Sequence, residues 1–262
     1  MVRSRVRASV LLLAVALLAA ACGGSGGNNS SGGSSSGSPT EIKVFAAASL
    51  TAAFNKIGQD WTAANPNTKV TFNFAGSQAL AAQIQQSAPA DVFASADTTN
   101  MGKVSSQVDT PKNFASNLLQ IIVAKGNPKG VKGLSDLSNP DLKVVLAAPD
   151  VPAGKYAQQA LGARHVTVKP VSLEDNVKAV VTKVSLGEAD AGIVDVADVA
   201  AGGDKVEGVD VPDSQNVPAT YPIAVLKGSS HQSQAQSFMN MVLSDQGQQV
   251  LKSFGFLPPP AS

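Results

Sequence analysis

The sequence predicts an α/β fold with largely parallel sheets, and two observations carry this prediction. Short apolar runs of strand length recur from about residue 41 to the end of the chain, and segments with a helical spacing of apolar residues lie between them. Such alternation is typical of parallel strands joined by crossover helices. This part of the chain is long enough for one large domain or for two lobes.

Seven apolar runs are predicted to be strands. In chain order they are residues 42–47, 69–75, 90–96, 118–124, 143–148, 191–197 and 221–228. Three helical faces are predicted where apolar residues recur three or four positions apart. These faces are expected in the core, and they consist of Leu50, Phe54, Ile57 and Trp61; of Val177, Val180, Val181 and Val184; and, within residues 233–256, of Ala235, Phe238, Met239 and Val242.

Residues 1–21 are predicted to be an export signal. Three arginines precede an uncharged apolar run, residues 10–21, which is too short to span a membrane comfortably. Cys22 follows three alanines, and the stretch resembles the lipobox of a bacterial lipoprotein, although the usual leucine lies one place early, at Leu18. We therefore predict lipidation of Cys22 and a lipid anchor in the bacterial cell membrane. The alternative is a soluble secreted protein with an incidental cysteine.

Residues 22–40 are rich in glycine and serine and are predicted to be a flexible tether. Cys22 is the only cysteine of the chain, so no internal disulfide is expected. Removal of the export signal takes away three of the 20 basic residues and leaves 17 against 19 acidic ones, a net charge of about −2. No basic stripe remains, and we expect no nucleic-acid partner.

Four junctions between a predicted strand and the following helix have the composition of an anion site. They are the turns at Ser49, at Ser77, at residues 152–154 and at residues 176–177. In parallel α/β sheets, ligands bind beyond the carboxyl ends of the strands, where helix N-termini present unpaired N–H groups and a partial positive charge. Several such N-termini would hold an anion without arginine, and the two serines would add hydroxyl donors. Taken singly, each serine has a plainer explanation as a favoured helix cap.

At these junctions the sequence resembles the ModA family of molybdate-binding proteins, which are periplasmic binding proteins of ABC transporters. The matching pieces include IKVFAAASLTAAF, SAPADVFASAD, VPAGKYAQQAL, EDNVKAV, LGEADAGIV and TYPIAVLKG, in order along the chain. The resemblance implies a two-lobed Venus-flytrap fold with two mixed, mainly parallel sheets flanked by helices. Lobe 1 would contain residues 41–116 and 221–262, and lobe 2 residues 117–220. The chain would cross between the lobes twice, near residues 117–120 and 217–222.

By the same resemblance, the ligand is molybdate or tungstate, held in the cleft by uncharged donors. Ser49 and Ser77 would donate from hydroxyl and backbone, and Ala153 and Val177 from backbone N–H groups. The expected partners are an ABC permease and its ATPase, served from outside the cytoplasm by a monomer that closes on its ligand. No cofactor is expected, nor any metal beyond that of the oxyanion.

Asp195 departs from the family pattern, because many members have a tyrosine donor in the corresponding segment. A carboxylate cannot donate a hydrogen bond, and two like charges about 4 Å apart repel by roughly 4 kcal/mol at an effective dielectric near 20. Three outcomes stay open: a protonated Asp195 that donates, a side chain turned away, or a changed ligand preference. We favour the protonated donor, because burial and a neighbouring anion both raise the pKa of a carboxyl group.

Enzymatic activity is not expected. Neither Ser49 nor Ser77 lies in a G-x-S-x-G motif, and both histidines, His165 and His231, are expected at the surface. The acidic residues are scattered and no His/Cys cluster exists, so the sequence predicts no metal site. Lys155, beside the third junction, is expected to be solvated. The remaining alternatives are a binding protein for another tetrahedral oxyanion such as sulfate, and a tethered oxyanion sensor.

Overall fold

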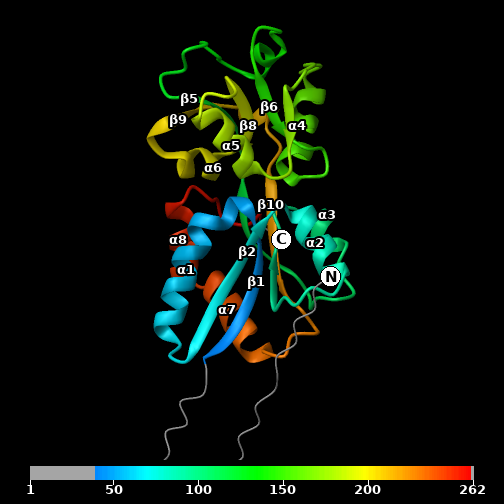
Figure 1. The fold of residues 1–262 in the computed structure, drawn as a ribbon, viewed down its shortest axis with the longest axis vertical. Coiled ribbons are helices and arrows are strands. Elements are labelled where there is room, and N and C mark those ends of the chain that lie inside the picture. The colour runs from blue at the N-terminus through cyan, green and yellow to red at the C-terminus, as the bar shows by residue number, and fades with distance from the viewer. Residues whose placement is uncertain (1–38, 261–262) are drawn as a thin grey trace, which may run out of the picture. The chain divides into compact units, whose positions relative to one another are not determined.

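The computed structural model describes residues 39–260. The predicted export signal, nearly all of the predicted tether and Cys22 lie outside the described residues. Two five-stranded sheets form the framework of the described chain (Figure 1). Within residues 39–260, no helix has both the length and the apolar character that a membrane span requires.

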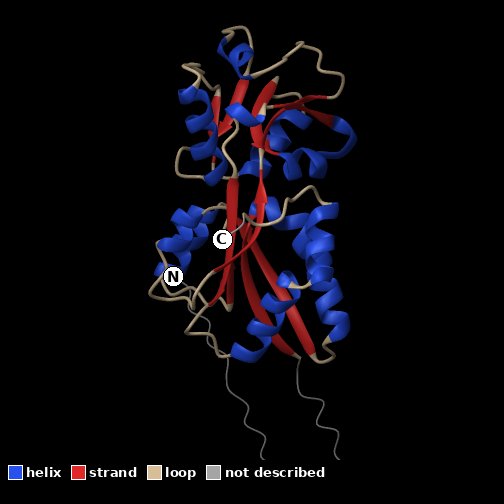
Figure 2. Ribbon diagram, turned by 180° about the vertical axis from the view of Figure 1, so that it is seen from behind, coloured by secondary structure: helices blue, strands red, loops and turns tan. Residues whose placement is uncertain are grey.

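The first sheet has the strand order β2-β1-β3-β10-β4. Its strands are β1 (Thr40–Ala47), β2 (Thr68–Ala75), β3 (Val92–Ala94), β4 (Lys112–Asn117) and β10 (Ala219–Val225). Helices lie on both sides of this sheet (Figure 2). They are α1 (Thr51–Ala64), which follows the 3-10 turn η1 (Ala48–Leu50), and α2 (Ser77–Gln85), α3 (Thr98–Gly102), α7 (Gln232–Leu243) and α8 (Asp245–Ser253).

The second sheet has the strand order β7-β6-β8-β5-β9. Its strands are β5 (Leu119–Ala124), β6 (Val144–Ala147), β7 (Ser172–Glu174), β8 (Ala191–Asp195) and β9 (Val206–Asp210). The helices associated with it are α4 (Pro152–Ala163), α5 (Val177–Ser185) and α6 (Val196–Gly202), and the short turns are η2 (Leu134–Ser138), η3 (Gly203–Lys205) and η4 (Asp213–Gln215). Both sheets are mixed, with two parallel and two antiparallel pairings each, so the expectation of mainly parallel sheets is wrong in the count of pairings.

Aromatic side chains fill the space between the first sheet and helices α1 and α7. The ring centroid of Phe54 lies 5.8 Å from that of Phe114 and 6.0 Å from that of Phe238. Trp61 packs edge-on against Phe238, with 5.8 Å between ring centroids. The three predicted helical faces are indeed buried, apart from Val181, which is half-buried. Their apolar periodicity therefore identified the core correctly.

Two predictions of secondary structure need correction. Residues 233–256 do not form one helix. The first helix ends before Ser244, whose hydroxyl accepts from Gly247 N–H at 3.2 Å and so caps a second helix, α8. Three strands, β4, β7 and β9, have no counterpart among the predicted runs. Each is an edge strand with few apolar residues. Such a strand is held by backbone hydrogen bonds to one neighbour, and these leave little hydrophobic pattern in the sequence.

The two chain segments that connect the sheets lie side by side. Only Leu118 separates β4 of the first sheet from β5 of the second, and Asn117 is paired with Ala219 at the start of β10. The Asn216 side chain accepts from Leu119 N–H and donates to Leu119 O, both at 2.8 Å. Among the described residues, the chain passes from the first sheet to the second between β4 and β5 and returns between β9 and β10.

Candidate functional site

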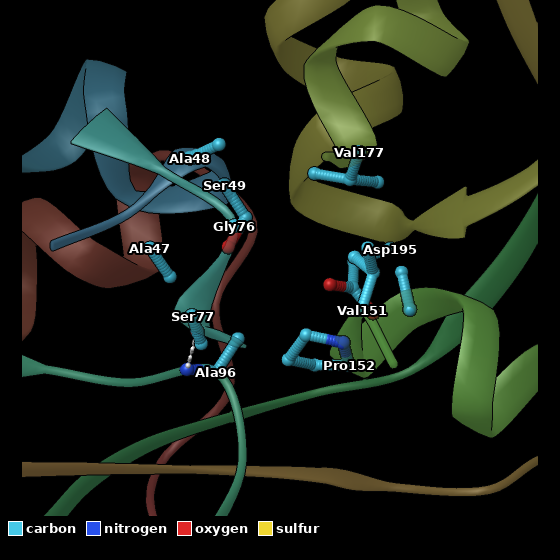
Figure 3. A pocket seen from close by; sticks show the side chains of 11 residues that line it. Ala47, Ala48, Ser49, Gly76, Ser77, Ala96, Val151, Pro152, Val177 and Asp195 are labelled. Carbon is cyan, nitrogen blue, oxygen red and sulfur yellow. Dashed lines mark hydrogen bonds between the residues drawn. The ribbon is translucent and has the colours of Figure 1, made fainter. Parts of the chain in front are cut away.

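A small pocket lies where the ends of both sheets meet. It encloses about 20 Å³, and eleven residues line it (Figure 3). The five residues expected to contact the ligand are all among them: Ser49, Ser77, Ala153, Val177 and Asp195. Because one water needs roughly 10–15 Å³ and drug-sized ligands occupy about 300–1,000 Å³, the space suits a ligand of very few heavy atoms.

Strand register brings the first two junctions together. Strands β1 and β2 are parallel with Ala47 opposite Ala75, and β1 and β3 are parallel with Ala46 opposite Ala94. The carboxyl ends of the three strands thus lie side by side, and the turns that follow them carry Ser49, Ser77 and Ala96 to the pocket. Parallel strands in register place their carboxyl ends together, so this convergence follows from the pairing.

The second sheet supplies the opposite wall in the same way. Strands β6 and β7 are parallel with Ala147 opposite Glu174, and each leads into a helix, α4 or α5, whose first turn reaches the pocket. Ala153 is the second residue of α4 and Val177 the first of α5. Backbone N–H groups in a helix's first turn have no partner within the helix, so both residues offer a free donor to a ligand.

Ser77 has a fixed orientation. Its Oγ accepts a hydrogen bond from Ala96 N–H at 3.0 Å (Figure 3), and the side chain is buried, with 1% exposed. Since the oxygen already has this donor, the hydroxyl hydrogen is available for an acceptor in the pocket. Ser77 can therefore donate to a ligand while its oxygen is held in place by Ala96.

Gly76, just before Ser77, allows the two walls to approach closely. A Cβ added to Gly76 would lie 2.5 Å from the carbonyl oxygen of Asp175, which belongs to the turn before α5. The side chain of Gln78 donates to the same carbonyl at 2.9 Å. A larger residue at this position would therefore push the two walls apart.

Asp195 is the single ionisable residue among those lining the pocket, and its carboxyl group is buried. Oδ2 accepts from the Tyr221 hydroxyl at 2.8 Å, whereas Oδ1 has no hydrogen-bond partner. Burial raises the pKa of Asp195 to about 6, against the opposing effect of the hydrogen bond from Tyr221. In this structure the Asp195 side chain lines the pocket and is held there by Tyr221.

Tyr221 is a residue of the site that the sequence did not reveal. Its hydroxyl lies 3.2 Å from Ser49 Oγ as well as 2.8 Å from Asp195 Oδ2, so it joins the two walls behind the pocket. The ring is held edge-on by Phe114 and Phe256, at centroid distances of 6.2 Å and 5.4 Å. In the sequence it stands in a strand with alternating apolar neighbours, which gives no sign that its hydroxyl reaches another lobe.

Lys155 is partly exposed, and it has partners that were not expected. Its Nζ lies 2.6 Å from Thr99 Oγ1 and 3.6 Å from the carboxylate of Asp97, which is buried. Lys155 comes from α4 beside the second sheet, and both partners come from the segment after β3 in the first. This contact joins the two walls at the side of the pocket.

The histidines lie elsewhere. His165 occupies a left-handed turn after α4, and His231 Nδ1 lies 3.5 Å from Asp91 before α7. Among the residues that the structure describes, no three His, Cys, Asp or Glu side chains come close enough to hold a metal ion. The pocket therefore consists of hydroxyls, helix N-termini and one carboxyl group.

The chain matches the family of bacterial extracellular solute-binding proteins over residues 42–257. It is also 43% identical to the molybdate-binding protein ModA of Mycobacterium tuberculosis (strain ATCC 25618 / H37Rv), over 83% of this chain and 85% of that protein. It is a member of the ModA family. The resemblance predicted from the sequence is thereby confirmed, and the family is one of solute-binding proteins.

One solved structure agrees with this ModA assignment, and a second agrees with the fold. The substrate-binding domain of a putative molybdenum ABC transporter from Clostridium difficile is 31% identical, with a TM-score of 0.62, over 84% of this chain and 99% of that one. The sulfate-binding protein SubI from Mycobacterium tuberculosis H37Rv gives a TM-score of 0.74 at 21% identity, over 84% and 87% of the two chains. At that identity the second likeness establishes the two-lobed fold alone, which confirms the predicted fold class.

Proposed function

We propose that this protein captures molybdate, or the similar tungstate, in the pocket between the two sheets. Ser49, Ser77, Ala153 and Val177 would donate hydrogen bonds to the oxygens of the anion. The observation that carries the proposal is their convergence, together with Asp195, around a single space of about 20 Å³. The 43% identity to a protein named for molybdate binding supports the choice of ligand.

The chemistry of the donors favours a fully deprotonated tetrahedral anion. Hydroxyls and helix N-termini carry hydrogens that point at the ligand, and they spread its charge over several dipoles. Phosphate near neutral pH brings a proton that needs an acceptor, and burying it without one is unfavourable. The small volume also disfavours organic phosphates, since their carbon skeletons exceed the space available.

Thermal-shift measurements with molybdate, tungstate, sulfate and phosphate test this assignment. A ligand at 100 times its Kd stabilises the folded protein by about 2.7 kcal/mol, so molybdate and tungstate should each raise the Tm and phosphate should not. Ser77→Ala should reduce the shift by about half or more, and Ser138→Ala, at an exposed turn, should leave it intact. A Tm that rises with sulfate alone would replace the metal oxyanion by sulfate as the ligand.

Ligand-driven closure would then signal to an ABC permease with its ATPase. Residues 41–116 and 221–262 would move as one lobe and residues 117–220 as the other, about the double crossing at Asn117 and Ala219. A ligand that touches both walls favours the state in which they are close, and it shifts the equilibrium by its differential affinity. The contacts of Lys155 and Gln78 across the pocket support such a closed state.

The location we propose is outside the cytoplasm, with a lipid anchor on Cys22 and a tether up to residue 40. The arginine-rich, apolar N-terminus and the alanines before Cys22 support it. Cells fed a radiolabelled fatty acid should label the wild-type protein and leave Cys22→Ala unlabelled. Label on both proteins, or on neither, would reject the anchor without bearing on ligand binding.

A further inference from the structure

Asp195, Tyr221 and Ser49 form a line of hydrogen-bonded groups that ends at the pocket. The Tyr221 hydroxyl donates to Asp195 Oδ2 at 2.8 Å and lies 3.2 Å from Ser49 Oγ. All three side chains are buried, with 3%, 0% and 7% of their surface exposed respectively. Asp195 Oδ1 is buried without any partner and belongs to a residue that lines the pocket. An unpartnered buried polar atom is rare and requires an explanation.

The number of polar hydrogens shared by Asp195, Tyr221 and Ser49 determines whether Ser49 presents a donor or an acceptor to the pocket. When Asp195 is ionised, it only accepts, so the Tyr221 hydrogen points to it and the Tyr221 oxygen accepts from Ser49. The Ser49 hydrogen is then turned away from the pocket, and a lone pair of Ser49 and the free Oδ1 face any ligand. For an oxyanion this arrangement is repulsive on both counts.

One added proton on Asp195 can reverse the direction of both hydrogen bonds. A proton on Oδ2 donates to Tyr221, the Tyr221 hydrogen moves to Ser49, and the Ser49 hydrogen becomes free for the pocket. A proton on Oδ1 instead points a hydrogen into the pocket directly. Either arrangement removes one negative charge and adds one donor, and no heavy atom has to move.

We propose that the protein takes up one proton with each dianion it binds, and that Asp195 holds this proton. The inference rests on the oxyanion-binding function proposed above and deepens it: the bound species is the dianion plus a proton, with net charge −1. Solvent supplies the proton on binding and receives it again on release. Tyr221 acts as a positioning residue, because it couples the protonation of Asp195 to the orientation of Ser49.

The titratable groups near Asp195 are one carboxyl group, two tyrosine hydroxyls and one lysine. Asp198 of α6 accepts from Asp195 N–H at 3.2 Å, and burial together with the charge of Asp195 raises the pKa of Asp198 well above its usual range. The hydroxyls of Tyr156 on α4 and Tyr221 on β10 stay neutral, because burial and nearby carboxylates raise their pKa values. The positive charge of Lys178 on α5 opposes the rise in the pKa of Asp198.

The expected dependence on pH follows from linkage. In the free protein the pKa of Asp195 is about 6, and a bound anion raises it further. Between these two values each anion binds with one proton, so affinity falls about tenfold for each unit of rising pH. Below the pKa of the free protein, Asp195 is already protonated and the affinity is independent of pH.

Isothermal titration calorimetry with sodium molybdate measures this uptake. Titrations at pH 7.5 in two buffers of equal ionic strength and different ionisation enthalpy give the number of protons bound per anion. We expect about one for the wild type and about tenfold weaker binding at pH 8.5 than at pH 7.5. For Asp195→Asn, whose amide supplies a permanent donor, we expect no uptake and an affinity that does not change over this range.

Asp198→Asn is the matched control, since it removes the neighbouring carboxyl group, which does not line the pocket. It should retain proton uptake.

Tight molybdate binding by the wild type with no proton uptake would overturn the inference and leave the proposed function standing. Uptake that persists in Asp195→Asn and disappears in Asp198→Asn would also overturn it. No molybdate binding at any pH would reject the proposed function itself. The wild-type titrations decide the question even if a variant does not fold.

Discussion

The two walls of the pocket offer the same kind of donor by different means. On the wall from the first sheet, Ser49 and Ser77 contribute side-chain hydroxyls, and each hydroxyl has a partner behind it, Tyr221 or Ala96. On the wall from the second sheet, Ala153 and Val177 contribute backbone N–H groups at the starts of α4 and α5. The only ionisable side chain of the pocket, Asp195, belongs to this second wall.

The donors of the first wall depend on the residue type, and those of the second depend on the course of the backbone. A hydroxyl depends on its residue type and can be removed by one substitution, whereas a backbone N–H is present in every residue except proline. The first wall is therefore sensitive to composition and the second to the path of the chain. Three substitutions, from the largest expected effect to the smallest, test that contrast.

Ser77→Ala should have the largest effect. It removes a donor to a charged ligand, which corresponds to about 1.5–3 kcal/mol, or a loss of roughly 10- to 150-fold in molybdate affinity. It also leaves the buried Ala96 N–H without its acceptor, so the free energy of unfolding should fall by about 1–3 kcal/mol. Calorimetry and urea unfolding measure the two effects. A variant with normal affinity and normal stability would remove Ser77 from the site.

Val177→Pro should weaken binding almost as much with less change in stability. Proline lacks the N–H, yet it is favoured at the first position of a helix, and Asn176 before it already has an extended backbone (φ −159°, ψ 163°). We expect a loss of about 1.5–3 kcal/mol in binding, by the same reasoning on charged hydrogen bonds. Val177→Ala is the matched control, because it shortens the side chain and keeps the donor. Equal affinities of the two variants would contradict the backbone role.

Lys155→Met should have the smallest effect. The lysine pairs with Asp97 across the pocket, but 34% of its side chain is exposed, so the contribution of the pair is about 1 kcal/mol or less. We expect up to a fivefold faster release of molybdate in stopped-flow measurements, since the contact exists only when the walls are close. Lys129→Met removes an exposed lysine that pairs with Asp190 away from the pocket, and it should leave the release rate unchanged. Identical rates for both variants would show that the Lys155 contact does not hold the closed state.

Several features of this protein were predictable from the sequence because they depend on local order along the chain. The apolar spacing around Phe54 and Phe238 identified buried helix faces, and small residues with Ser49 and Ser77 marked the turns that now surround the pocket. Within one sheet the convergence of two junctions was predictable, since neighbouring parallel strands end on the same side of the sheet. The meeting of junctions from the two sheets was expected only from the family resemblance. By contrast, the edge strands and the helix break at Ser244 depend on neighbouring backbone and on a single cap, which leave only a weak pattern.

Tertiary structure alone decided the environment of the ionisable groups. The sequence by itself predicted that Asp195 lies near the expected ligand, but not that Tyr221, 26 positions later, donates to it and reaches Ser49. Nor did it determine that Lys155 pairs with the buried Asp97 across the pocket. Hydrogen bonds and desolvation act over a few ångströms in space between segments that are far apart in the chain. A carboxyl group therefore acquires its pKa, and its role, only when the lobes have folded around it.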